Sequence, residues 1–391
     1  MARKRFEIVS ADVHILEPPD IWEKHLPKKF SDHAPKLVKD QEGGDAWQYS
    51  VGSPDPIGLV STPGKRFDEF RWYGVSYDNI RPGCFNGKER LRDMDIDGVD
   101  AEIVFPPQRT IGHWLGYPDE AVSLAGIDAY NEFVFDEFAA ADPERIFPCY
   151  QIPNLNVDTG LKYLEKAKKK GARSVVISSW PSGGENISPE DDEFWTACVD
   201  ANMPVNIHIS LMSRAAGVKS YEAGQKVTSG VKKGGGAANQ RAVGAMSGVF
   251  TRTTPVLVGF ILSGALDRFP DLQVVLTEIG VGWIPHFMEQ IDDRYWRNRG
   301  WGEINIKEPP SYYWYKNFAA TFMIDFAGVF QRNAVGVRNM MWSTDYPHHG
   351  NDWPYSRKTI NEMMADVEPH ERYDIVAGNA VRIFKLPETF D

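Results

Sequence analysis

The stretch Phe6-Glu-Ile-Val-Ser-Ala-Asp-Val-His-Ile-Leu-Glu-Pro-Pro19 decides the fold, because it has the pattern of a short buried strand followed by polar residues. Residues 6–10 are apolar with one charge, and the prolines at 18 and 19 cannot continue a strand because proline donates no ladder hydrogen bond. Asp12, His14 and Glu17 therefore lie at the carboxyl end of this strand. Side chains alternate along an extended chain, so Asp12 and His14 can both reach one metal ion. The alternative is a capping aspartate and a hydrogen-bonded histidine in a turn.

The composition is that of a globular protein without a basic face. The chain has 391 residues, 42% of them hydrophobic, and a net charge of −11, which disfavours nucleic acid or an anionic membrane surface as partner. Three scattered cysteines fit neither a disulfide framework nor a cysteine zinc site. No signal-like apolar region follows the basic start, and no run approaches the ~18 apolar residues of a membrane span. We therefore expect a soluble, cytoplasmic protein.

Strand-like runs recur along the chain, and a crossover of a dozen or more residues follows each of them. After the first run they occupy residues 99–105, 145–152, 174–178, 204–210, 272–278, 318–324 and 339–343. Helical patterns lie between them, at residues 88–97, 119–140, 157–170, 189–201, 255–268, 283–296 and 327–332, and again from residue 355 onward. Such crossovers are typical of parallel βαβ units. Eight units predict an α/β fold of the closed (β/α)8, or TIM barrel, type. A doubly wound open sheet is the alternative, but no Gly-x-Gly-x-x-Gly follows the first strand.

Two segments differ from this alternation. Residues 20–95 are rich in Pro, Gly, Lys and Asp, with apolar residues too dispersed to close a core alone, and we interpret them as an insertion or lid after the first strand. Residues 211–254 are interpreted as a mobile loop after the fifth strand. The whole chain, residues 1–391, is thus predicted to form a single barrel domain.

Residues that can bind a metal fall at the carboxyl ends of the expected strands. Asp12 and His14 follow the first strand, His208 lies in the fifth, Glu278 ends the sixth and Asp345 follows the eighth. In a barrel those strand ends converge on one mouth. Nitrogen and oxygen ligands without thiolate suit Zn²⁺, Mn²⁺ or Fe²⁺, and three or four protein ligands leave a position for water. The sequence therefore predicts one divalent metal ion.

Further residues near the same strand ends are candidates for contacts with a substrate. Arg109 and His113 follow the second strand, and the fork of Arg109 suits a substrate carboxylate, although a surface arginine has the same pattern. His348 lies just beyond Asp345 and is expected to line the mouth, unless it is a solvated loop histidine. Trp342 is either an aromatic wall or a packing residue. Glu17 either caps a helix near residue 20 or supports the metal ligands from behind.

The ordered set of these motifs resembles a known family. Its parts are Asp12-Val-His14-x-x-Glu17-Pro18, the strand-five His208, Glu278-Ile-Gly-Val-Gly-Trp-Ile-Pro285, Ser343-Thr-Asp345-Tyr-Pro-His348 and Gly378-Asn-Ala380. Together they resemble the amidohydrolase superfamily, and within it the metal-dependent hydrolases and decarboxylases related to aminocarboxymuconate semialdehyde decarboxylase. The resemblance extends from residue 8 to about residue 385.

The resemblance implies roles for single positions. The family's first-strand pair is often His-x-His, and here Asp12 replaces the first histidine while His14 is retained. The family's strand-five histidine matches His208, and its strand-eight aspartate, which lies beside the ligands and carries protons, matches Asp345. Glu278 stands where the family commonly has a histidine that orients the substrate. A carboxylate in place of imidazole favours harder ions, so Mn²⁺ competes with Zn²⁺.

Two reactions suit these residues. A divalent ion lowers the pKa of bound water toward ~7, and Asp345, with Glu278 as the rival base, can then take its proton. We therefore expect a metal-dependent hydrolase of a small, aromatic or cyclic substrate. The alternative is a metal-dependent decarboxylase of an aromatic or unsaturated carboxylic acid, in which protonated Asp345 delivers a proton to carbon as carbon dioxide leaves. A barrel that only binds a ligand is disfavoured by the retained Asp345.

Aromatic residues outside the expected strands point to self-association. Residues 297–317 contain Trp301, Tyr312, Tyr313, Trp314 and Tyr315, more aromatic surface than a loop normally exposes to water. A homodimer or a larger symmetric oligomer is therefore expected.

Overall fold

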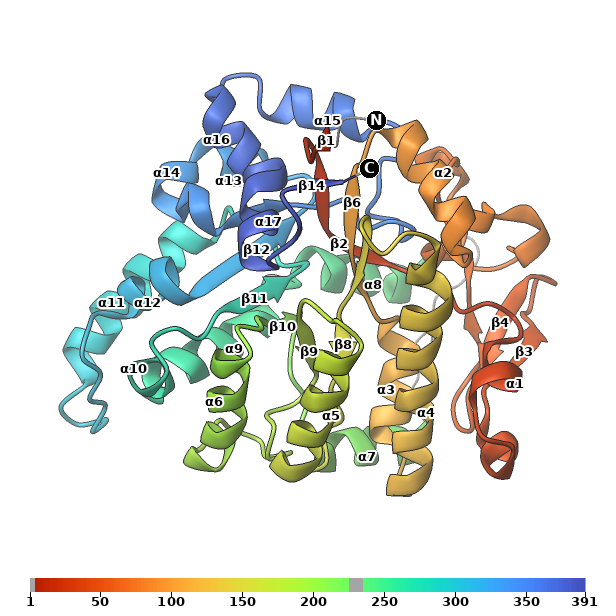
Figure 1. The fold of residues 1–391 in the computed structure, drawn as a ribbon, viewed down its shortest axis with the longest axis horizontal. Coiled ribbons are helices and arrows are strands. Elements are labelled where there is room, and N and C mark those ends of the chain that lie inside the picture. Colours follow the sequence, from red (N-terminus) through yellow and green to blue (C-terminus); the bar gives the residue numbers. More distant parts are fainter. Residues whose placement is uncertain (1–3, 225–234, 391) are drawn as a thin grey trace.

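The computed structural model describes residues 4–224 and 235–390, and it has parallel strands at its centre with helices around them (Figure 1). Three strands pair in the order β2–β6–β7 and six in the order β8–β9–β10–β11–β12–β13, all in parallel. Their bounds are β2 Val9–His14, β6 Ala101–Phe105, β7 Ile146–Pro148, β8 Tyr150–Gln151, β9 Val175–Ile177, β10 Val205–His208, β11 Val274–Thr277, β12 Phe318–Phe322 and β13 Met340–Trp342. The prediction of an α/β protein built on parallel strands is confirmed.

Each predicted strand has a counterpart, with two differences in detail. The third predicted strand is divided at Cys149 into β7 and β8, because the Cys149 N–H still donates to the Val104 carbonyl while Tyr150 already pairs with β9. The first strand was predicted to end before Asp12, and that boundary is wrong. β2 continues to His14 because Val13 and His14 remain paired with β6 beyond a register irregularity. Asp12 and His14 therefore lie within a strand.

The strands are buried on both faces, as expected for parallel sheets. One face contributes small and medium side chains, including Val9, Ala101, Val176, Val275 and Ala319, to a cluster closed by the C-terminal helix. The residues between them on the same strands, such as Val104, Val175 and Ile207, pack against the surrounding helices in the main core. This double burial explains why the strands appear in the sequence as continuous apolar runs.

The helices fall between the strands as predicted, with shifted ends. Asp119 caps the helix after β6, because its carboxylate accepts from the N–H groups of Ala121 and Val122. The bounds are α2 Gly87–Asp97, α4 Glu120–Phe133, α5 Val157–Lys169, α6 Asp192–Asp200, α9 Phe250–Leu262, α10 Ala265–Arg268, α11 Ile284–Asn298, α12 Pro310–Asn317, α13 Phe326–Phe330, α14 Arg332–Val335, α15 Ser356–Met363, α16 Pro369–Tyr373 and α17 Asn379–Ile383. Helix α3, Gln108–Gly116, follows β6 and was not predicted.

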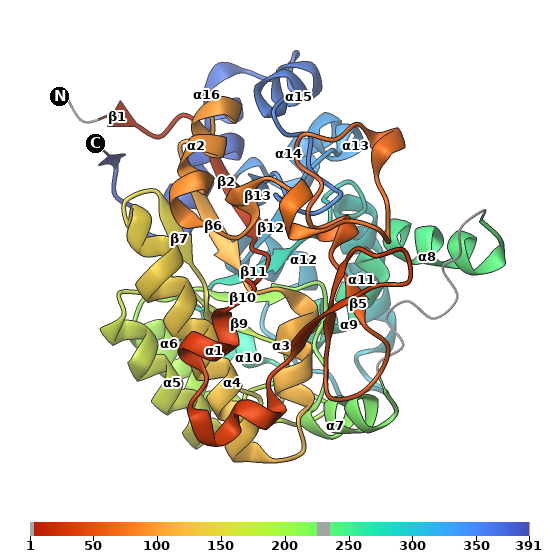
Figure 2. The ribbon, with the colours of Figure 1, turned by 90° about the vertical axis from the view of Figure 1, so that its right-hand side faces the viewer.

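The segment at residues 20–95 has more regular structure than its sequence indicates. It begins with α1, Ile21–His25, a short helix that the sequence predicts at residues 20–25, and then forms an unpredicted small antiparallel sheet of β3 Lys36–Lys39, β4 Asp45–Gln48 and β5 Asp55–Pro56. Figure 2 looks onto this segment, drawn in red and orange. Its Trp47 and Ile57 belong to the main core, so this segment is packed onto the rest of the molecule. Its role as a lid stays a prediction.

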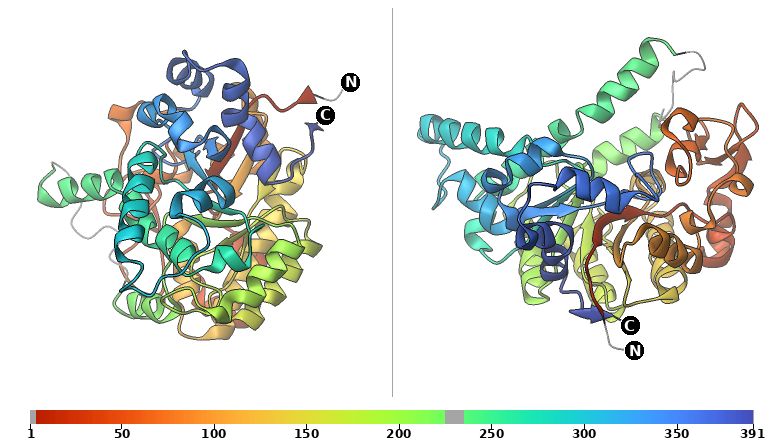
Figure 3. Two further views of the ribbon diagram at one scale, coloured as in Figure 1. Left: turned by 90° about the vertical axis from the view of Figure 1, so that its left-hand side faces the viewer. Right: turned by 90° about the horizontal axis from the view of Figure 1, so that it is seen from above.

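The predicted loop at residues 211–254 contains helices, so its description as a loop is wrong. They are α7 Arg214–Glu222, α8 Ala237–Ser247 and the start of α9, while residues 225–234 of the predicted loop lie outside the described residues. Helix α8 projects from the body of the molecule in both views of Figure 3, and none of its side chains is buried. The sequence gives little sign of this helix because the apolar residues of α8 do not form a continuous stripe along one face. Its mobility stays a prediction.

The described residues contain one helical stretch, Ala237–Leu262, that is long and apolar enough to cross a membrane by length and composition. Its second half is α9, whose Val256, Leu257 and Phe260 are buried in the main core.

Strands β1 Lys4–Arg5 and β14 Thr389–Phe390 pair in antiparallel fashion and bring the two ends of the described chain together.

Candidate active site

The carboxyl ends of three strands bring four of the candidate site residues together. Asp12 and His14 come from β2, His208 ends β10, and Glu278 follows β11 directly. The Nε2 atoms of His14 and His208 lie 2.9 Å apart, and Asp12 Oδ1 lies 3.6 Å from the first and 3.8 Å from the second. Glu278 Oε2 approaches His208 Nε2 to 3.3 Å. These four side chains form a group that can hold one metal ion.

Asp345, which follows β13, joins this group from the other side. Its Oδ1 lies 3.7 Å from His14 Nε2 and 3.1 Å from His348 Nδ1. The ring of His348 stacks on that of His14, with centroids 4.1 Å apart. His14, Glu278, Asp345 and His348 form a second, overlapping group that can hold an ion. Residues from both ends of the sequence therefore meet around His14.

The backbone bends sharply where the strands end. Ile209, Glu278 and Asp345 have positive φ angles of 64°, 60° and 58°, which are uncommon for residues with a Cβ atom. Each follows one of the strands that carry the ligands. Such conformations persist where the surrounding structure enforces them, and they concentrate at functional sites. Here they direct Glu278 and Asp345 to the cluster.

Buried polar contacts hold the first and last strands in register at the site. The Asp345 N–H donates to the Asp12 carbonyl at 3.0 Å, and the Thr344 N–H donates to Ser10 Oγ at 2.8 Å. The fully buried Arg90 donates to the His14 carbonyl at 2.6 Å and to the Glu102 carboxylate at 2.8 Å. The ligands on β2 are therefore fixed from both sides.

The electrostatics of the cluster favour a cation. Burial raises the pKa of Asp12, Glu278 and Asp345 well above the ordinary values, and the charge of Asp345 raises the pKa of the other two further. Burial also lowers the pKa of His14 and His208 well below 6.5, so both rings are neutral at pH 7. Neutral imidazoles and crowded carboxylates are the donor set that a divalent ion binds.

Hydrogen bonding gives an independent test of this fit. Neither carboxylate oxygen of Asp12 has a hydrogen-bond partner in bonding geometry among the described residues, although the side chain is fully buried. His14 Nδ1 lies 3.3 Å from the Pro106 carbonyl and can donate to it, which directs Nε2 to the cluster. The Thr321 hydroxyl lowers the pKa of Asp12, but burial outweighs it, and a buried carboxylate with so few donors is costly unless a cation compensates it. The residues present therefore fit a divalent ion.

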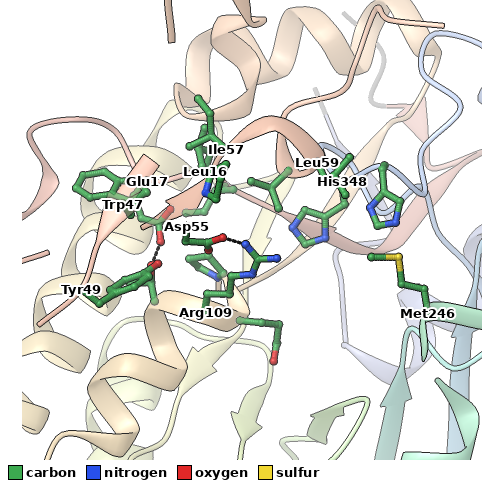
Figure 4. Close-up of a pocket in the computed structure, with 17 residues that line it drawn as sticks. Leu16, Glu17, Trp47, Tyr49, Asp55, Ile57, Leu59, Arg109, Met246 and His348 are labelled. Atoms are coloured by element: carbon green, nitrogen blue, oxygen red, sulfur yellow. Dashed lines mark hydrogen bonds and ion pairs between the residues drawn. The ribbon is translucent and has the colours of Figure 1, made fainter. Parts of the chain in front are cut away.

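A pocket of about 170 Å³ adjoins the cluster through His348. Figure 4 shows the residues that line it. Arg109 is ion-paired to Asp55, and Tyr49 and Glu17 lie on the side of this pair away from His348. Thr110 Oγ1 donates to the Glu17 carboxylate, and the Tyr49 hydroxyl lies 2.8 Å from Thr110 Oγ1. Burial raises the pKa of Glu17 to about 7. The rest of the wall is mostly apolar, with Trp47, Ile57, Leu59 and Met246 among its residues.

The predicted substrate residues divide into two groups. Arg109 and His348 line this pocket, and so does Glu17, which makes no capping hydrogen bond to α1. His113 is buried among the rings of Tyr49, Trp114, Tyr117 and Tyr221, so it packs behind the lining residue Tyr49 and does not line the pocket itself. Trp342 is also buried and borders a separate cavity of about 10 Å³. A role in substrate binding stays a prediction for each of them.

Sequence reasoning missed several polar residues near the site. Tyr49, Asp55 and Thr110 line the pocket, yet the first two lie in the segment interpreted as a lid. Arg252, in the first turn of α9, is exposed, and its charge lowers the pKa of Glu278 and of His208. For Tyr49 and Asp55 the sequence offered one signal. A segment interpreted as a lid over the barrel mouth is expected to contribute residues to the pocket beneath it.

A family model described as amidohydrolase matches residues 12–386. The chain belongs to the amidohydrolase family. The resemblance inferred from the motifs is thereby confirmed, and the chain is a member of a family of metal-dependent enzymes that includes hydrolases and carboxy-lyases.

Solved structures of similar fold cover nearly the whole chain. An amidohydrolase from Mycobacterium avium subsp. paratuberculosis K-10 has a TM-score of 0.70 at 15% identity, covering 97% of this chain and 99% of its own. The 5-carboxyvanillate decarboxylase of Sphingomonas paucimobilis has a TM-score of 0.64 at 19% identity, with coverages of 98% and 100%. A dihydroxybenzoic acid decarboxylase from Polaromonas sp. JS666, with bound manganese and the inhibitor 2-nitroresorcinol, has a TM-score of 0.61 at 15% identity and covers 97% of each chain. At these identities the likeness shows a common fold.

Proposed function

We propose that this chain is a metal-dependent, non-oxidative decarboxylase of an aromatic carboxylic acid. The observation that carries the proposal is the pocket of about 170 Å³ that shares His348 with the cluster of carboxyl groups. A cavity of about 150 Å³ is enough to hold benzene, so a single aromatic ring fits beside the cluster. Two of the similar structures are decarboxylases of aromatic acids, which favours this reaction over the hydrolysis that the sequence placed first.

We propose a closed (β/α)8 barrel as the scaffold, with an insertion after the first strand and a long excursion after the fifth. The hydrogen bonds from Asp345 to Asp12 and from His14 to the Tyr346 carbonyl, 3.0 Å and 2.6 Å long, join the two edges of the strand array. A barrel of this kind gathers its strand ends at one mouth, where the active site of such enzymes lies.

The metal ligands in this proposal are Asp12, His14, His208 and Asp345. Manganese is favoured over zinc, with iron as a further candidate, because the cluster holds three carboxyl groups and the Polaromonas enzyme binds manganese. A divalent ion, when bound, supplies the positive charge that fixes the substrate carboxylate and polarises it. Arg252 adds positive charge near the same place, since its field reaches Glu278 and His208.

Asp345 is proposed to move the proton. Burial raises the pKa of its carboxyl group, and in the protonated form the side chain can donate its proton to the ring carbon. The electrons of the breaking carbon–carbon bond remain on that carbon, and carbon dioxide leaves. His348 Nδ1, 3.1 Å from Asp345 Oδ1, positions the carboxyl group beside the pocket.

Hydrolysis is the second candidate, because Glu278 is a partly exposed carboxylate at the cluster and can act as a base toward water. The two reactions differ in their products. The manganese-loaded protein, incubated with hydroxybenzoates in deuterated water, should release carbon dioxide and place deuterium on the ring carbon. Solvent ¹⁸O in the product of an arylamide or lactone, without carbon dioxide from any aromatic acid, would instead identify a hydrolase.

Assembly and location are also proposals. Trp301, Tyr312 and Tyr315 are 79%, 41% and 48% exposed, whereas Tyr313 and Trp314 are buried within the chain. We propose that these three exposed rings contribute to a homodimer or larger oligomer of a cytoplasmic enzyme. A monomeric mass by light scattering at micromolar concentration would contradict the oligomer.

A further inference from the structure

We infer that Asp55 selects substrates with a single carboxylate: its ion pair with Arg109 leaves the pocket without net positive charge, so the ring enters with hydroxyl groups and not with a second carboxylate. This inference rests on the proposed function, because it assumes that an aromatic acid occupies the pocket. It concerns the ring positions of the aromatic acid that lie farthest from the carboxylate that is lost.

The ion pair between Arg109 and Asp55 is part of the pocket wall. Arg109 lies in the first turn of α3 and Asp55 in β5, so the pair joins the strand-end region to the segment at residues 20–95. The Asp55 side chain is 9% exposed and that of Arg109 is 28% exposed. The Asp55 carboxylate, ion-paired with the guanidinium, offsets the attraction that Arg109 would otherwise exert on an anion. Arg109 therefore does not act as a free cation here.

At the end of the pocket away from His348, a chain of hydrogen bonds leads from Tyr49 through Thr110 to an accepting carboxyl group. Thr110 donates its hydroxyl hydrogen to the Glu17 carboxylate, so the hydroxyl of Tyr49, 2.8 Å from Thr110 Oγ1, must donate to Thr110. The chain ends on Glu17, whose side chain is almost fully buried. Glu17 and Asp55 thus present carboxyl oxygens to the pocket. A phenolic hydroxyl can donate to such oxygens, whereas a second carboxylate cannot.

The balance of charge over the lining supports the same conclusion. Among the described lining residues, Arg109 is the one permanent cation, and Asp55 and Glu17 are the two carboxyl groups. His348 and His349 also line the pocket, at its end nearest the cluster. Asp55 offsets the charge of Arg109, and Glu17 adds negative charge when it is ionised, so a second substrate carboxylate would meet no net attraction, which disfavours an anion that otherwise has the right shape.

The experiment compares two acids that differ at one ring position. Binding of 2,4-dihydroxybenzoate and of 2-hydroxybenzene-1,4-dicarboxylate to the manganese-loaded protein is measured by titration calorimetry, and carbon dioxide release is followed in parallel. The wild-type protein should bind the monoacid at least about tenfold more tightly than the diacid. Asp55→Asn, which removes the charge and keeps the size, should reduce that preference by about tenfold or more.

Two further variants keep the test decisive. Asp192→Asn breaks an Arg–Asp pair on the far surface, with Arg268, and should leave the preference unchanged. Arg109→Gln leaves the Asp55 carboxylate without its counter-charge, so it should bind the diacid still more weakly and widen the preference for the monoacid. A narrower preference in Arg109→Gln than in the wild type would overturn the inference, even if Asp55→Asn did not fold.

The remaining outcomes are equally distinct. A wild-type protein that binds the diacid as tightly as the monoacid, or binds neither, overturns the inference. If the monoacid is preferred and the preference depends on Asp55, but no aromatic acid loses carbon dioxide, the selectivity stands while the proposed decarboxylation fails. If carbon dioxide is released but Asp55→Asn keeps the wild-type preference, the proposed decarboxylation stands and the inference about Asp55 fails.

Discussion

Replacing Glu17 by glutamine should stabilise the protein at alkaline pH and have little effect at acidic pH. The Glu17 side chain is 3% exposed, and burial raises its pKa from 4.5 to about 7 in the folded protein. The folded state therefore binds a proton at this site more tightly than the unfolded state does. The stability that this proton contributes is fully present below pH 4.5 and is lost as the pH rises through about 7.

The size of the effect follows from the same two values. A rise from 4.5 to about 7 corresponds to about 3 kcal/mol against the ionised form in the folded protein. Glutamine is nearly isosteric, stays neutral and keeps an oxygen that can accept the hydrogen bond from Thr110. Glu17→Gln should thus exceed the wild type by up to about 3 kcal/mol at pH 8, and the two should be nearly equal at pH 4.5.

The assay is urea denaturation of metal-free wild-type protein and variant at pH 4.5, 6 and 8. Glu190→Gln, at an exposed position, serves as the control and should change stability by no more than about 0.5 kcal/mol at each pH. A difference between Glu17→Gln and the wild type that is the same at pH 4.5 and pH 8 would refute the reasoning. A variant less stable than the wild type at pH 8 would do so as well, because it would mean that the carboxylate has better partners than Thr110.

The other predictions concern the ion, the proton and the scaffold. Asp345→Asn keeps an oxygen for the metal but cannot carry a proton, so it should retain bound metal and lose at least about a hundredfold in kcat, measured on the best aromatic acid found. Glu278→Gln is assayed in parallel, and an inactive Glu278→Gln beside a nearly normal Asp345→Asn would reverse the two roles. His14→Ala and His208→Ala should each weaken manganese binding by at least about tenfold, or about 1.4 kcal/mol, as measured by titration against a competing chelator. Unchanged binding in both would remove the metal from this site. Arg90→Met leaves a buried carboxylate without its partner and should destabilise the protein by about 3–5 kcal/mol in denaturant melts, and a loss under about 1 kcal/mol would show that the pair is not structurally required.

The elements around the core could be predicted from the sequence because their signals are local. Parallel strands covered on both faces appear as continuous apolar runs, and Asp119 and the glycine after residue 170 mark helix ends through their own chemistry. Residues 20–95 could not be predicted in the same way. Their Trp47 and Ile57 are buried only against the rest of the molecule, so the short strands β3 to β5 have no apolar face of their own to display.

The ends of the elements depend on pairing between distant segments. β2 extends through Asp12 to His14 because β6 continues to pair with it, although residues 11–14 by themselves look like a turn. Helix α8 likewise forms without any buried residue, and neither outcome has a signal in the local pattern.

The candidate ligands were identified from residue type and strand end, since a strand's carboxyl end is a local property and the convergence of such ends is a property of the parallel fold. The sequence by itself thus determined the strand order, the Asp12–His14 pair and the approach of His208, Glu278 and Asp345 to it.

Only the tertiary structure decided the electrostatics. The ion pair between Arg109 and Asp55, the pKa of about 7 for Glu17 and the place of His113 among aromatic rings all depend on burial and on partners far away in the chain. Charge and solvation act through space and over a few ångströms, so residue spacing along the sequence carries almost no information about them.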